Sequence, residues 1–510
     1  MKKLKNITIV GGGSAAWLAA AYIQHNMWDI SLTVIDKEAG NPIGVGEATV
    51  LTFPHFLREC GINLTDWFQA VDGTYKAGIN FPGWRNPEGS VWHPFYLNRS
   101  YPHRAMTQYD VWSQKQDNDF KTHALPTYKV SKENKIDMWG AFETLAYHID
   151  AGKLVNVLQQ HCEAGQRTGA DFKLIKSDVI DVNRNQHGDV VSLGLANGAT
   201  HTSDFYIDCT GFASVLKTPK RVELLGEGRL FTNCAVAGHV PYEDMDKECT
   251  PYVNCPAVDH GWIWKIPTQS RIGSGMVFNK DITDVETAKQ YFSDHWDGRI
   301  KPEDMKVIDW VPYYSENFWE NNVVSIGLSG GFIEPLESTG LASMTNGVKM
   351  LVDRIPQYAY TQADVNSYNN EMAYWYDDAV DYINSHYADT KWDTPFWNYV
   401  KETHVKSEKH LFYEAWLKNP QRKFYTNVQS RTLFHPPNWH LWLIQMGYPV
   451  VKDLHYINPM EIDNTTNEFV KQEEIRLKTS VTHKDAIDTT NWGTDWWERA
   501  SQRGDKGYIV

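Results

Sequence analysis

The sequence predicts an α/β fold: a Rossmann-type nucleotide-binding domain with a mainly helical C-terminal region packed on it. Three observations support this prediction. An apolar, strand-like run over residues 4–10 leads through three glycines into a helix-like run over 14–26. Further strand-like runs follow between residues 173 and 327. From Leu341 onward, apolar residues recur at helical spacing.

The first of these runs is the clearest structural unit. Residues 4–10 read as a buried strand, 14–26 as a helix, and Ser31 to Asp36 as a second strand. Gly11, Gly13 and Ala16 form a G-x-G-x-x-A turn, in which small residues let a pyrophosphate approach the backbone. The start of the helix then faces the phosphates. We therefore predict a dinucleotide held by this turn, by the Asp36 carboxylate on a ribose hydroxyl, and by the first helical residues Ser14 and Ala15.

The middle of the chain reads as an insertion followed by strands. Residues 70 to about 150 show few periodic elements, as an inserted segment would, and we expect the insertion to cover about 40–150. Strands are predicted near 173–181, 189–196, 203–208, 231–238, 262–266, 272–278 and 323–327. Gly273-Ser274-Gly275 lies inside such a run, so no second dinucleotide motif follows a strand. The chain is therefore expected to bind one dinucleotide and to lack an NAD(P)H site.

The last third of the chain is predicted to be helical. Leu341, Met344, Val348, Leu351 and Ile355 share one face of a helix that Pro356 ends. Mainly helical sequence follows, with a polar tail of mixed charge after residue 473. We expect a dinucleotide-binding domain over 1–355 and a helical substrate-binding region over 356–510, continuous with it.

Composition narrows the class of protein. The 510 residues are 42% hydrophobic and 22% charged, and the net charge of −14 argues against a nucleic-acid partner. The glycine run at 11–13 argues against a signal peptide, and no apolar window is long enough for a membrane span. The six cysteines form no C-x-x-C pair and no His/Cys cluster, so we expect reduced thiols, no metal site and a cytoplasmic location. The 21 tryptophans fill a core or, in part, line a slot for a flat aromatic substrate.

Several short segments, taken in order, resemble one enzyme family. Trp262-Ile263-Trp264-Lys265-Ile266-Pro267 matches the W-x-W-x-I-P signature of flavin-dependent halogenases. Residues 44–49 are similar to that family's flavin strap, 74–78 to its catalytic-lysine segment, 92–95 to its substrate wall and 332–340 to its F-x-x-P-x-x-S-x-G block. From the N-terminus to about residue 460, the chain looks like the tryptophan-halogenase branch.

The resemblance implies a reaction in two chambers. Reduced FAD reacts with oxygen to give a hydroperoxide, a halide ion attacks it, and the hypohalous acid passes to a lysine beside the aromatic substrate. The matching catalytic residues are Lys76, which would hold the halogen, and Glu337, which would stabilise or deprotonate the cationic ring. Burial would favour the neutral amine that a haloamine requires. A cap on the following helix is the alternative role for Glu337.

The resemblance also implies binding residues. The helix that starts near Leu341 would hold a halide ion at the backbone of Thr339 and Gly340. Further cofactor contacts are implied for Gly46, Glu47, Ala48, Thr49, Gly327 and Leu336, and substrate contacts for His93, Phe95, Ser338 and Trp439. Trp262 and Trp264 alternate in a strand and share one face, either as plain core or as a wall that keeps the organic substrate from the flavin.

The C-terminal substrate segment departs from the family. Asn438-Trp439 and Met446-Gly447-Tyr448-Pro449 resemble it, but tryptophan-using members carry upstream a Tyr-Tyr pair and a Glu that grip the amino acid's charged groups. Counting without gaps gives Asn427-Val428 and Phe434 there, although Phe424-Tyr425 lies just upstream. A desolvated ammonium needs a carboxylate partner. We therefore expect an indole-type arene without that head group, with chloride, bromide or iodide left open.

The expected partners are a separate flavin reductase and a small aromatic substrate, and a homo-oligomer is left open. Two other functions fit part of the sequence. A flavin-dependent aromatic monooxygenase would need neither Lys76 nor Glu337, and a non-catalytic flavin-binding protein would turn over no arene.

Overall fold

The computed structural model describes residues 3–37, 46–95, 125, 127–137, 145–165, 171–355, 358–419, 432–451 and 459–491. The Rossmann-type unit that the sequence predicts is present. β1 (Asn6–Val10), α1 (Ser14–Asn26) and β2 (Ser31–Asp36) follow one another, and β1 pairs in parallel with both β2 and β13 (Phe205–Asp208). α1 and β2 have the bounds that the sequence predicts. The central strand β1 is buried on both faces, which explains its unbroken apolar run.

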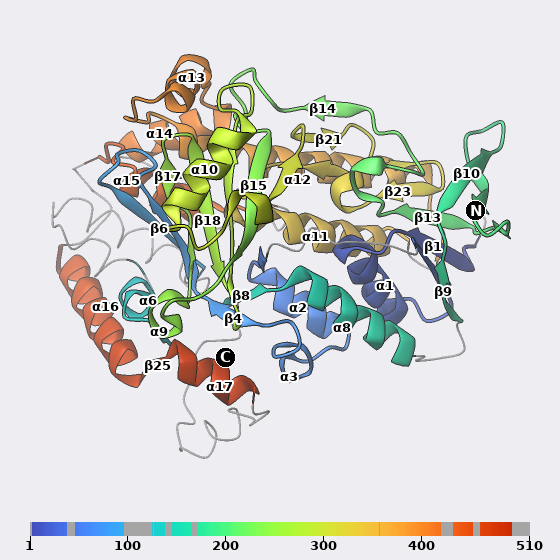
Figure 1. Cartoon of the computed structure of the whole chain (residues 1–510), viewed down its shortest axis with the longest axis horizontal. Coiled ribbons are helices and arrows are strands. Elements are labelled where there is room, and N and C mark those ends of the chain that lie inside the picture. The colour runs from blue at the N-terminus through green and yellow to red at the C-terminus, as the bar shows by residue number, and fades with distance from the viewer. Residues whose placement is uncertain are drawn as a thin grey trace.

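This first sheet has six strands in the order β22-β23-β13-β1-β2-β9. The outer strands are β22 (Trp319–Glu320), β23 (Val323–Ser325) and β9 (Phe172–Lys176). The helices α8 (Ala151–Ala164) and α11 (Thr339–Asp353) pack on α1, whose first three turns are buried. Figure 1 shows this sheet and its helices at one end of the molecule, beside the N-terminus.

The strand predicted over 173–181 is in fact two strands in different sheets. β9 ends at Lys176, and the Ser177 amide donates to the Asp36 carbonyl, which turns the chain away. β10 (Val179–Arg184) then starts a separate three-stranded sheet with β11 (Val190–Leu195) and β12 (Thr200–His201). The apolar pattern runs through both strands, so it gave no sign of the break.

The second large sheet contains part of the segment that was expected to be an insertion. Its path is β20-β15-β19-β18-β16-β5-β6, with β17 also paired to β18. The W-x-W strand β18 (Gly261–Pro267) lies in the middle, and β5 (Gly78–Pro82) and β6 (Ser90–Pro94) extend the sheet through β16. The other members are β15 (Cys234–Val240), β16 (Val253–Asn254), β17 (Ala257–Val258), β19 (Ile272–Phe278) and β20 (Lys306–Asp309).

Three smaller sheets connect these layers. One joins β3 (Glu47–Ala48), β8 (Ala146–Ile149) and β4 (Thr74–Lys76), so the strap and lysine segments share a sheet. A second contains β14 (Arg221–Glu223), β21 (Tyr313–Ser315) and β24 (Gly331–Phe332). The third pairs β7 (Lys135–Ile136) with β25 (Val481–Thr482). The short helices of this part of the chain are α2 (Thr52–Glu59), α3 (Leu64–Trp67), α6 (Tyr128–Lys132), α9 (Met245–Glu248) and α10 (Val285–His295).

The C-terminal region is helical, as predicted. It contains α12 (Gln362–Tyr387), α13 (Pro395–Thr403), α14 (Glu408–Lys418), α15 (Pro436–Gln445), α16 (Pro459–Thr479) and α17 (His483–Asn491). The expected polar tail after residue 473 is wrong in one respect, because α17 is packed into the molecule beneath β4 (Figure 1). His483, Ala486, Ile487 and Thr490 are its buried residues.

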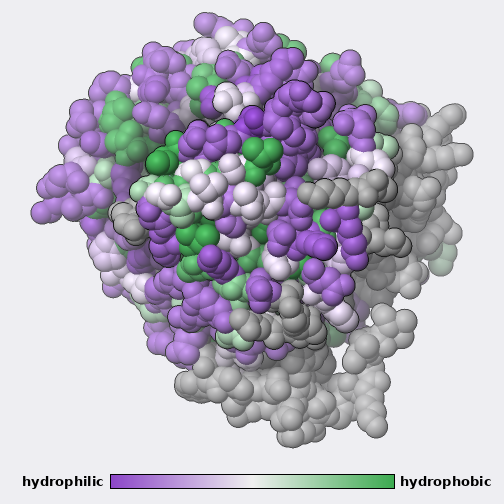
Figure 2. Space-filling view, turned by 90° about the vertical axis from the view of Figure 1, so that its right-hand side faces the viewer, coloured by the Kyte–Doolittle hydropathy of each residue, from purple (hydrophilic) through white to green (hydrophobic). Residues whose placement is uncertain are grey.

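One hydrophobic core extends from Leu4 to Ile487 and includes most of the buried tryptophans. Figure 2 shows one face of the molecule, on which hydrophilic residues predominate and hydrophobic residues lie in small groups. All six cysteines are buried free thiols. In the described ranges, no helix is long and apolar enough to cross a membrane, and no three His, Cys, Asp or Glu side chains are grouped to hold a metal ion.

Candidate active site

Lys76 lies at the end of β4 and is fully buried. Its Nζ donates to the Thr49 carbonyl at 3.0 Å and to Ser338 Oγ at 2.7 Å, and it lies 4.5 Å from the centroid of the Phe95 ring. Burial lowers the pKa of Lys76 to about 7, against a smaller opposing effect of the Glu337 charge. Both acceptors are neutral, so the site tolerates an uncharged amine.

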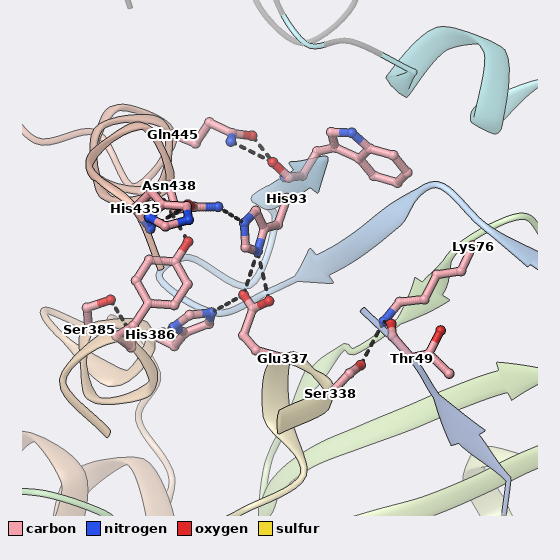
Figure 3. A network of polar contacts seen from close by, with 12 residues as sticks. Thr49, Lys76, His93, Glu337, Ser338, Ser385, His386, His435, Asn438 and Gln445 are labelled. Atoms are coloured by element: carbon pink, nitrogen blue, oxygen red, sulfur yellow. Dashed lines mark hydrogen bonds and ion pairs between the residues drawn. The ribbon is translucent and has the colours of Figure 1, made fainter. Parts of the chain in front are cut away.

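Glu337 comes from a strained turn that precedes α11. Glu337 and Ser338 both have left-handed backbone conformations, with φ of 61° and 62°. Such values are uncommon for residues other than glycine and are found where tertiary contacts impose them. As a result, two successive side chains point in different directions: Ser338 toward Lys76, and Glu337 toward two histidines (Figure 3).

The Glu337 carboxylate is therefore not a helix cap. Its oxygens lie 2.8 Å from His93 Nδ1, and Oε1 lies 2.9 Å from His386 Nε2. Burial alone would raise the pKa of this carboxyl, but the two histidines outweigh burial and lower the pKa below its usual range. The capping alternative is thus contradicted by the contacts that the side chain makes.

The protonation of His93 follows from its second partner. The His435 amide donates to Asn438 Oδ1 at 2.9 Å, which fixes the amide orientation of Asn438. Its Nδ2 therefore faces His93 Nε2, at 2.8 Å, and donates to it. His93 is consequently the neutral tautomer that carries its proton on Nδ1 and donates to Glu337.

His386 faces acceptors on both sides. Its Nδ1 lies 2.9 Å from the Tyr382 carbonyl, which can only accept, so Nδ1 carries a proton. Its Nε2 faces Glu337 Oε1, where a second proton is needed. Burial lowers the pKa of His386 and opposes that proton, whereas the bond to Glu337 favours it. At 2.9 Å, two atoms that both lack a proton would repel each other, so we infer that Glu337 Oε1 and His386 Nε2 share one proton.

The turn between β1 and α1 fits a dinucleotide. Gly11 has φ of +132°, and a Cβ there would lie 2.3 Å from the Cys209 carbonyl oxygen. A Cβ on Gly13 would meet no atom within 4 Å, so space is open in front of the helix start, where Ser14, Ala15 and Ala16 follow. No side chain caps that end of α1. Open space and free amide groups at a helix N-terminus are what a pyrophosphate requires.

The other predicted cofactor residues surround this turn and the small β3 sheet. Asp36 ends β2 beside Gly12, and its carboxylate is paired with Lys176 at 2.5 Å. Glu47 and Ala48 form β3, and Thr49 follows, with its carbonyl on Lys76. Burial raises the pKa of Glu47 to about 7. Gly46 is described, whereas residues 44 and 45 of the strap segment lie outside the described residues.

A small pocket brings the predicted halide and flavin residues together. Thr339 and Gly340, the first residues of α11, line it with Gly327 and with Phe332, Ile333 and Met344. A Cβ on Gly340 would meet no atom within 4 Å, so the backbone at the helix start faces open space. The predicted cofactor residue Leu336 is fully buried beside this turn. An anion could reach free amide groups here.

The predicted aromatic walls are closely packed. Trp262 and Trp264 lie on one face of β18 with ring centroids 6.2 Å apart, and Trp264 covers Gly275 of β19. Trp439 is fully buried, stacked on Tyr413 at 5.3 Å and edge-on to Tyr382 at 5.2 Å. Of the predicted substrate residues, Ser338 contacts the Lys76 amine at 2.7 Å. The centroid of the Phe95 ring lies 4.5 Å from that amine and 6.4 Å from the centroid of the His93 ring.

Three residues of this site were missed by sequence reasoning: His386, Asn438 as a partner of His93, and Tyr382. His386 and Tyr382 lie in the long helix α12, and Asn438 lies in the first turn of α15. A His-to-carbonyl bond to the residue four positions earlier leaves no sequence signature that separates it from an ordinary helix interior. The pairing of Glu337 with His386 is decided by how α12 packs on the turn before α11.

Comparisons with known proteins agree with this architecture. A family model described as tryptophan halogenase matches residues 6–457. A tryptophan 6-halogenase of Streptomyces albogriseolus is 28% identical over 428 residues, which is 78% of this chain and 79% of that protein. A tryptophan 7-halogenase of Lentzea aerocolonigenes is 27% identical over 482 residues, 87% of this chain and 90% of that protein. A solved flavin-dependent halogenase from Xanthomonas campestris has a TM-score of 0.86 at 24% identity, covering 96% of this chain and 99% of its own.

Proposed function

This chain belongs to the tryptophan halogenase family, and on that premise we propose that it halogenates an electron-rich, uncharged arene of the indole type. The reaction would use FADH2, O2 and a halide ion, with the flavin reduced by a separate reductase. The observation that carries the proposal is the Lys76 amine: it is fully buried, has a pKa lowered to about 7, and is held by neutral acceptors.

When bound, reduced FAD supplies the two electrons with which O2 and a halide ion form hypohalous acid. The residues that would hold the FAD are those of the β1–α1 turn with Asp36, the strap residues 46–49, and Gly327 and Leu336. Thr339 and Gly340 would hold the halide at the start of α11. Trp262 and Trp264 would separate the flavin from the arene.

Lys76 would take the halogen from hypohalous acid. The neutral amine either donates a hydrogen bond to hypohalous acid or exchanges one N–H for an N–X bond, with release of water. The lowered pKa provides the neutral form near pH 7 without a separate base. Ser338 Oγ, at 2.7 Å, would orient the amine toward an arene beside His93 and Phe95.

Glu337 would act on the ring. Attack on the halogen places positive charge on the arene and leaves one proton to be removed from the substituted carbon. A carboxylate in a dry site stabilises that charge and can accept that proton. The pair with His386 keeps the carboxyl group in place.

We propose an arene without the charged ammonium and carboxylate groups of an amino acid, and the surroundings of Phe434 support this choice of substrate. This ring stacks on Tyr382 with centroids 4.0 Å apart. The nearby Asp378 is engaged by Lys409 and by the Leu433 and Phe434 amides, at 3.0 and 3.2 Å for the latter two. Residues 424, 425, 427 and 428 lie outside the described residues. A buried ammonium unmatched by a carboxylate costs about 3 kcal/mol, which is a factor of about 100 in kcat/KM.

The test is a mass-spectrometric assay with FAD, a flavin reductase and NADH. Indole, tryptophan and a phenol are each offered with chloride, bromide or iodide. We expect halogenated indole, with kcat/KM about 100-fold above that of tryptophan.

A Lys76→Ala variant with catalase should give no product, whereas Lys265→Ala should be active. Lys265 is a matched control because burial lowers its pKa to about 8, while its amine lies 4.3 Å from the Trp296 ring centroid instead of in this site. Hydroxylated product that does not depend on halide would contradict the proposal.

A further inference from the structure

The strand that carries Lys76 is an edge strand. Among the described residues, β4 pairs with β8 alone, in a register that sets Tyr75 opposite Tyr147 and Lys76 opposite Ala146. The other edge of β4 would therefore present unpaired backbone groups in the interior of the protein. Buried backbone amides are nearly always paired, so this edge needs a cover.

The cover is the C-terminal helix α17. The Tyr75 amide, next to Lys76, donates to His483 Nε2 at 3.1 Å, and His483 is buried. His483 Nδ1 lies 2.8 Å from the Cys249 carbonyl, which can only accept. Nδ1 therefore carries the ring proton, and the lone pair on Nε2 is free for the Tyr75 amide. A single tautomer satisfies both bonds, and burial, which lowers the pKa of His483 to about 4, keeps the ring neutral.

A second bond joins the same two elements. The Tyr75 hydroxyl lies 2.6 Å from Thr490 Oγ1, and Thr490 donates its own proton to the Ala486 carbonyl at 3.0 Å. The phenol therefore donates to Thr490. Tyr75 is consequently held at its backbone by the first residue of α17 and at its side chain by a residue near the end of that helix.

α17 is itself fixed to the body of the protein. The His483 amide donates to the Asn134 carbonyl at 2.9 Å, and the preceding β25 pairs with β7. Lys484 is ion-paired with Asp246 at 3.3 Å, although both side chains are largely exposed and this pair adds little. The helix is therefore a fixed support for β4, and it lies beyond residue 457, where the family match ends.

We propose that His483 is a positioning residue for Lys76, so that the segment after the family match places the lysine amine against Ser338 and Thr49. The inference rests on the proposed role of Lys76. An amine displaced by 1 Å would intercept hypohalous acid less often, at a cost of up to about 100-fold in product. Hypohalous acid would then leave the enzyme, while the flavin reacts as before.

Two substitutions of His483 distinguish its hydrogen bond to the Tyr75 amide from its hydrogen bond to the Cys249 carbonyl. In His483→Gln, the amide oxygen reaches the place of Nε2 and accepts from Tyr75. In His483→Asn, the amide nitrogen takes the place of Nδ1 and retains the bond to Cys249, but Tyr75 has no acceptor. His161→Asn is the matched control. It is the same substitution of a histidine that bonds through Nε2, here to the Cys60 carbonyl at 3.1 Å, but His161 lies in α8 and not in α17.

The first readouts need no catalysis. Hydrogen exchange of the peptide over 74–77 should be slow in the native protein, in the Gln variant and in the His161 control, and about tenfold faster in the Asn variant. Reductive methylation of Lys76, mapped by peptide mass spectrometry, should increase in the Asn variant alone. If that variant does not fold, Thr490→Val removes the acceptor of the Tyr75 hydroxyl and should raise both signals to a smaller extent.

The third readout is the fate of hypohalous acid. The His483→Asn variant should bind FAD with the native affinity, within about twofold, but form about tenfold less halogenated product or even less. A small-molecule trap in solution should then be halogenated by the hypohalous acid that leaves the enzyme. Unchanged Lys76 methylation in the Asn variant would overturn the proposal, and so would equal losses in the Gln and Asn variants. A native protein that halogenates no arene would refute the proposed function instead, and the exchange and methylation data would still decide whether His483 positions the lysine.

Discussion

At the scale of the residue, the Lys76 amine is set apart by full burial between two neutral acceptors. Because its pKa is lowered to about 7, the neutral share rises from about 10% at pH 6 to about 90% at pH 8. If the neutral amine takes the halogen, product formation should rise about ninefold over this range. The measurement uses chemically reduced FAD, so that no reductase limits the rate. A flat profile would mean that the ammonium form, by hydrogen bonding alone, holds the hypohalous acid.

The same group makes folding depend on pH. The folded-state pKa of Lys76 lies below its ordinary value of 10.5, so between about pH 7 and 10.5 the unfolded chain binds the extra proton. The free energy of unfolding should therefore rise with pH across that window through Lys76. Denaturant unfolding of Lys76→Met against the native protein measures this contribution, and the variant should show the shallower slope. An identical slope in both would exclude a lowered pKa.

Glu337 and His386 form the second chemical unit at this scale. Glu337→Gln removes the carboxylate and should lower the halogenation rate by about 10²–10⁴-fold. His386→Asn retains a donor for the Tyr382 carbonyl but loses the proton shared with Glu337, so we expect a smaller loss, with His93 still bound to the carboxylate. Single-turnover product formation measures both variants, and FAD titration is the control. An unaffected His386→Asn rate would show that the shared proton has no part in the reaction.

At the scale of the element, the β1–α1 turn offers a matched pair of glycines. A methyl group on Gly13 enters open space, whereas one on Gly12 would lie 1.8 Å from Asp36 Oδ1. Gly13→Ala should therefore fold normally and bind FAD at least about tenfold more weakly, because the methyl group occupies the approach of the pyrophosphate. Gly12→Ala should instead lower the melting temperature. Calorimetric FAD titration and thermal unfolding distinguish the two, and normal FAD affinity in Gly13→Ala would place the dinucleotide elsewhere.

Elements were predictable where local pattern and packing agree. The bounds of α1 and β2 could be read from the sequence, because the glycine turn and the apolar runs reflect local requirements. β5 and β6 were missed, because β5 pairs with β16, a segment about 170 residues away, and β6 joins the sheet only through β5. The helix α17 was missed as well, because only the side with His483, Ala486, Ile487 and Thr490 is buried, and a short polar helix resembles a tail in the sequence.

At the scale of the whole molecule, the boundary predicted at residue 355 divides a continuous core. Leu351 and Ile355 share a hydrophobic cluster with Val365, Tyr368 and Met372. We therefore expect the full chain to unfold in one calorimetric transition, and a fragment of residues 1–355 to be insoluble or unable to bind FAD. Expression of that fragment, beside the full chain, tests this. A fragment that folds and binds FAD would establish the boundary as a domain boundary.

The sequence by itself determined the Rossmann-type unit, because its glycine turn and apolar runs are local requirements. The candidate residues Lys76, Glu337, Thr339 and Gly340 came from the resemblance of several short segments, in order, to one family, and local chemistry alone would not have identified them. The tertiary structure decided how those residues are held. Burial of the lysine, the left-handed turn that separates Glu337 from Ser338, the proton shared with His386, and the support of β4 by His483 all join segments far apart in the chain. Such contacts depend on which helix packs on which strand, and side chains in helices carry no mark of the partner that they will meet.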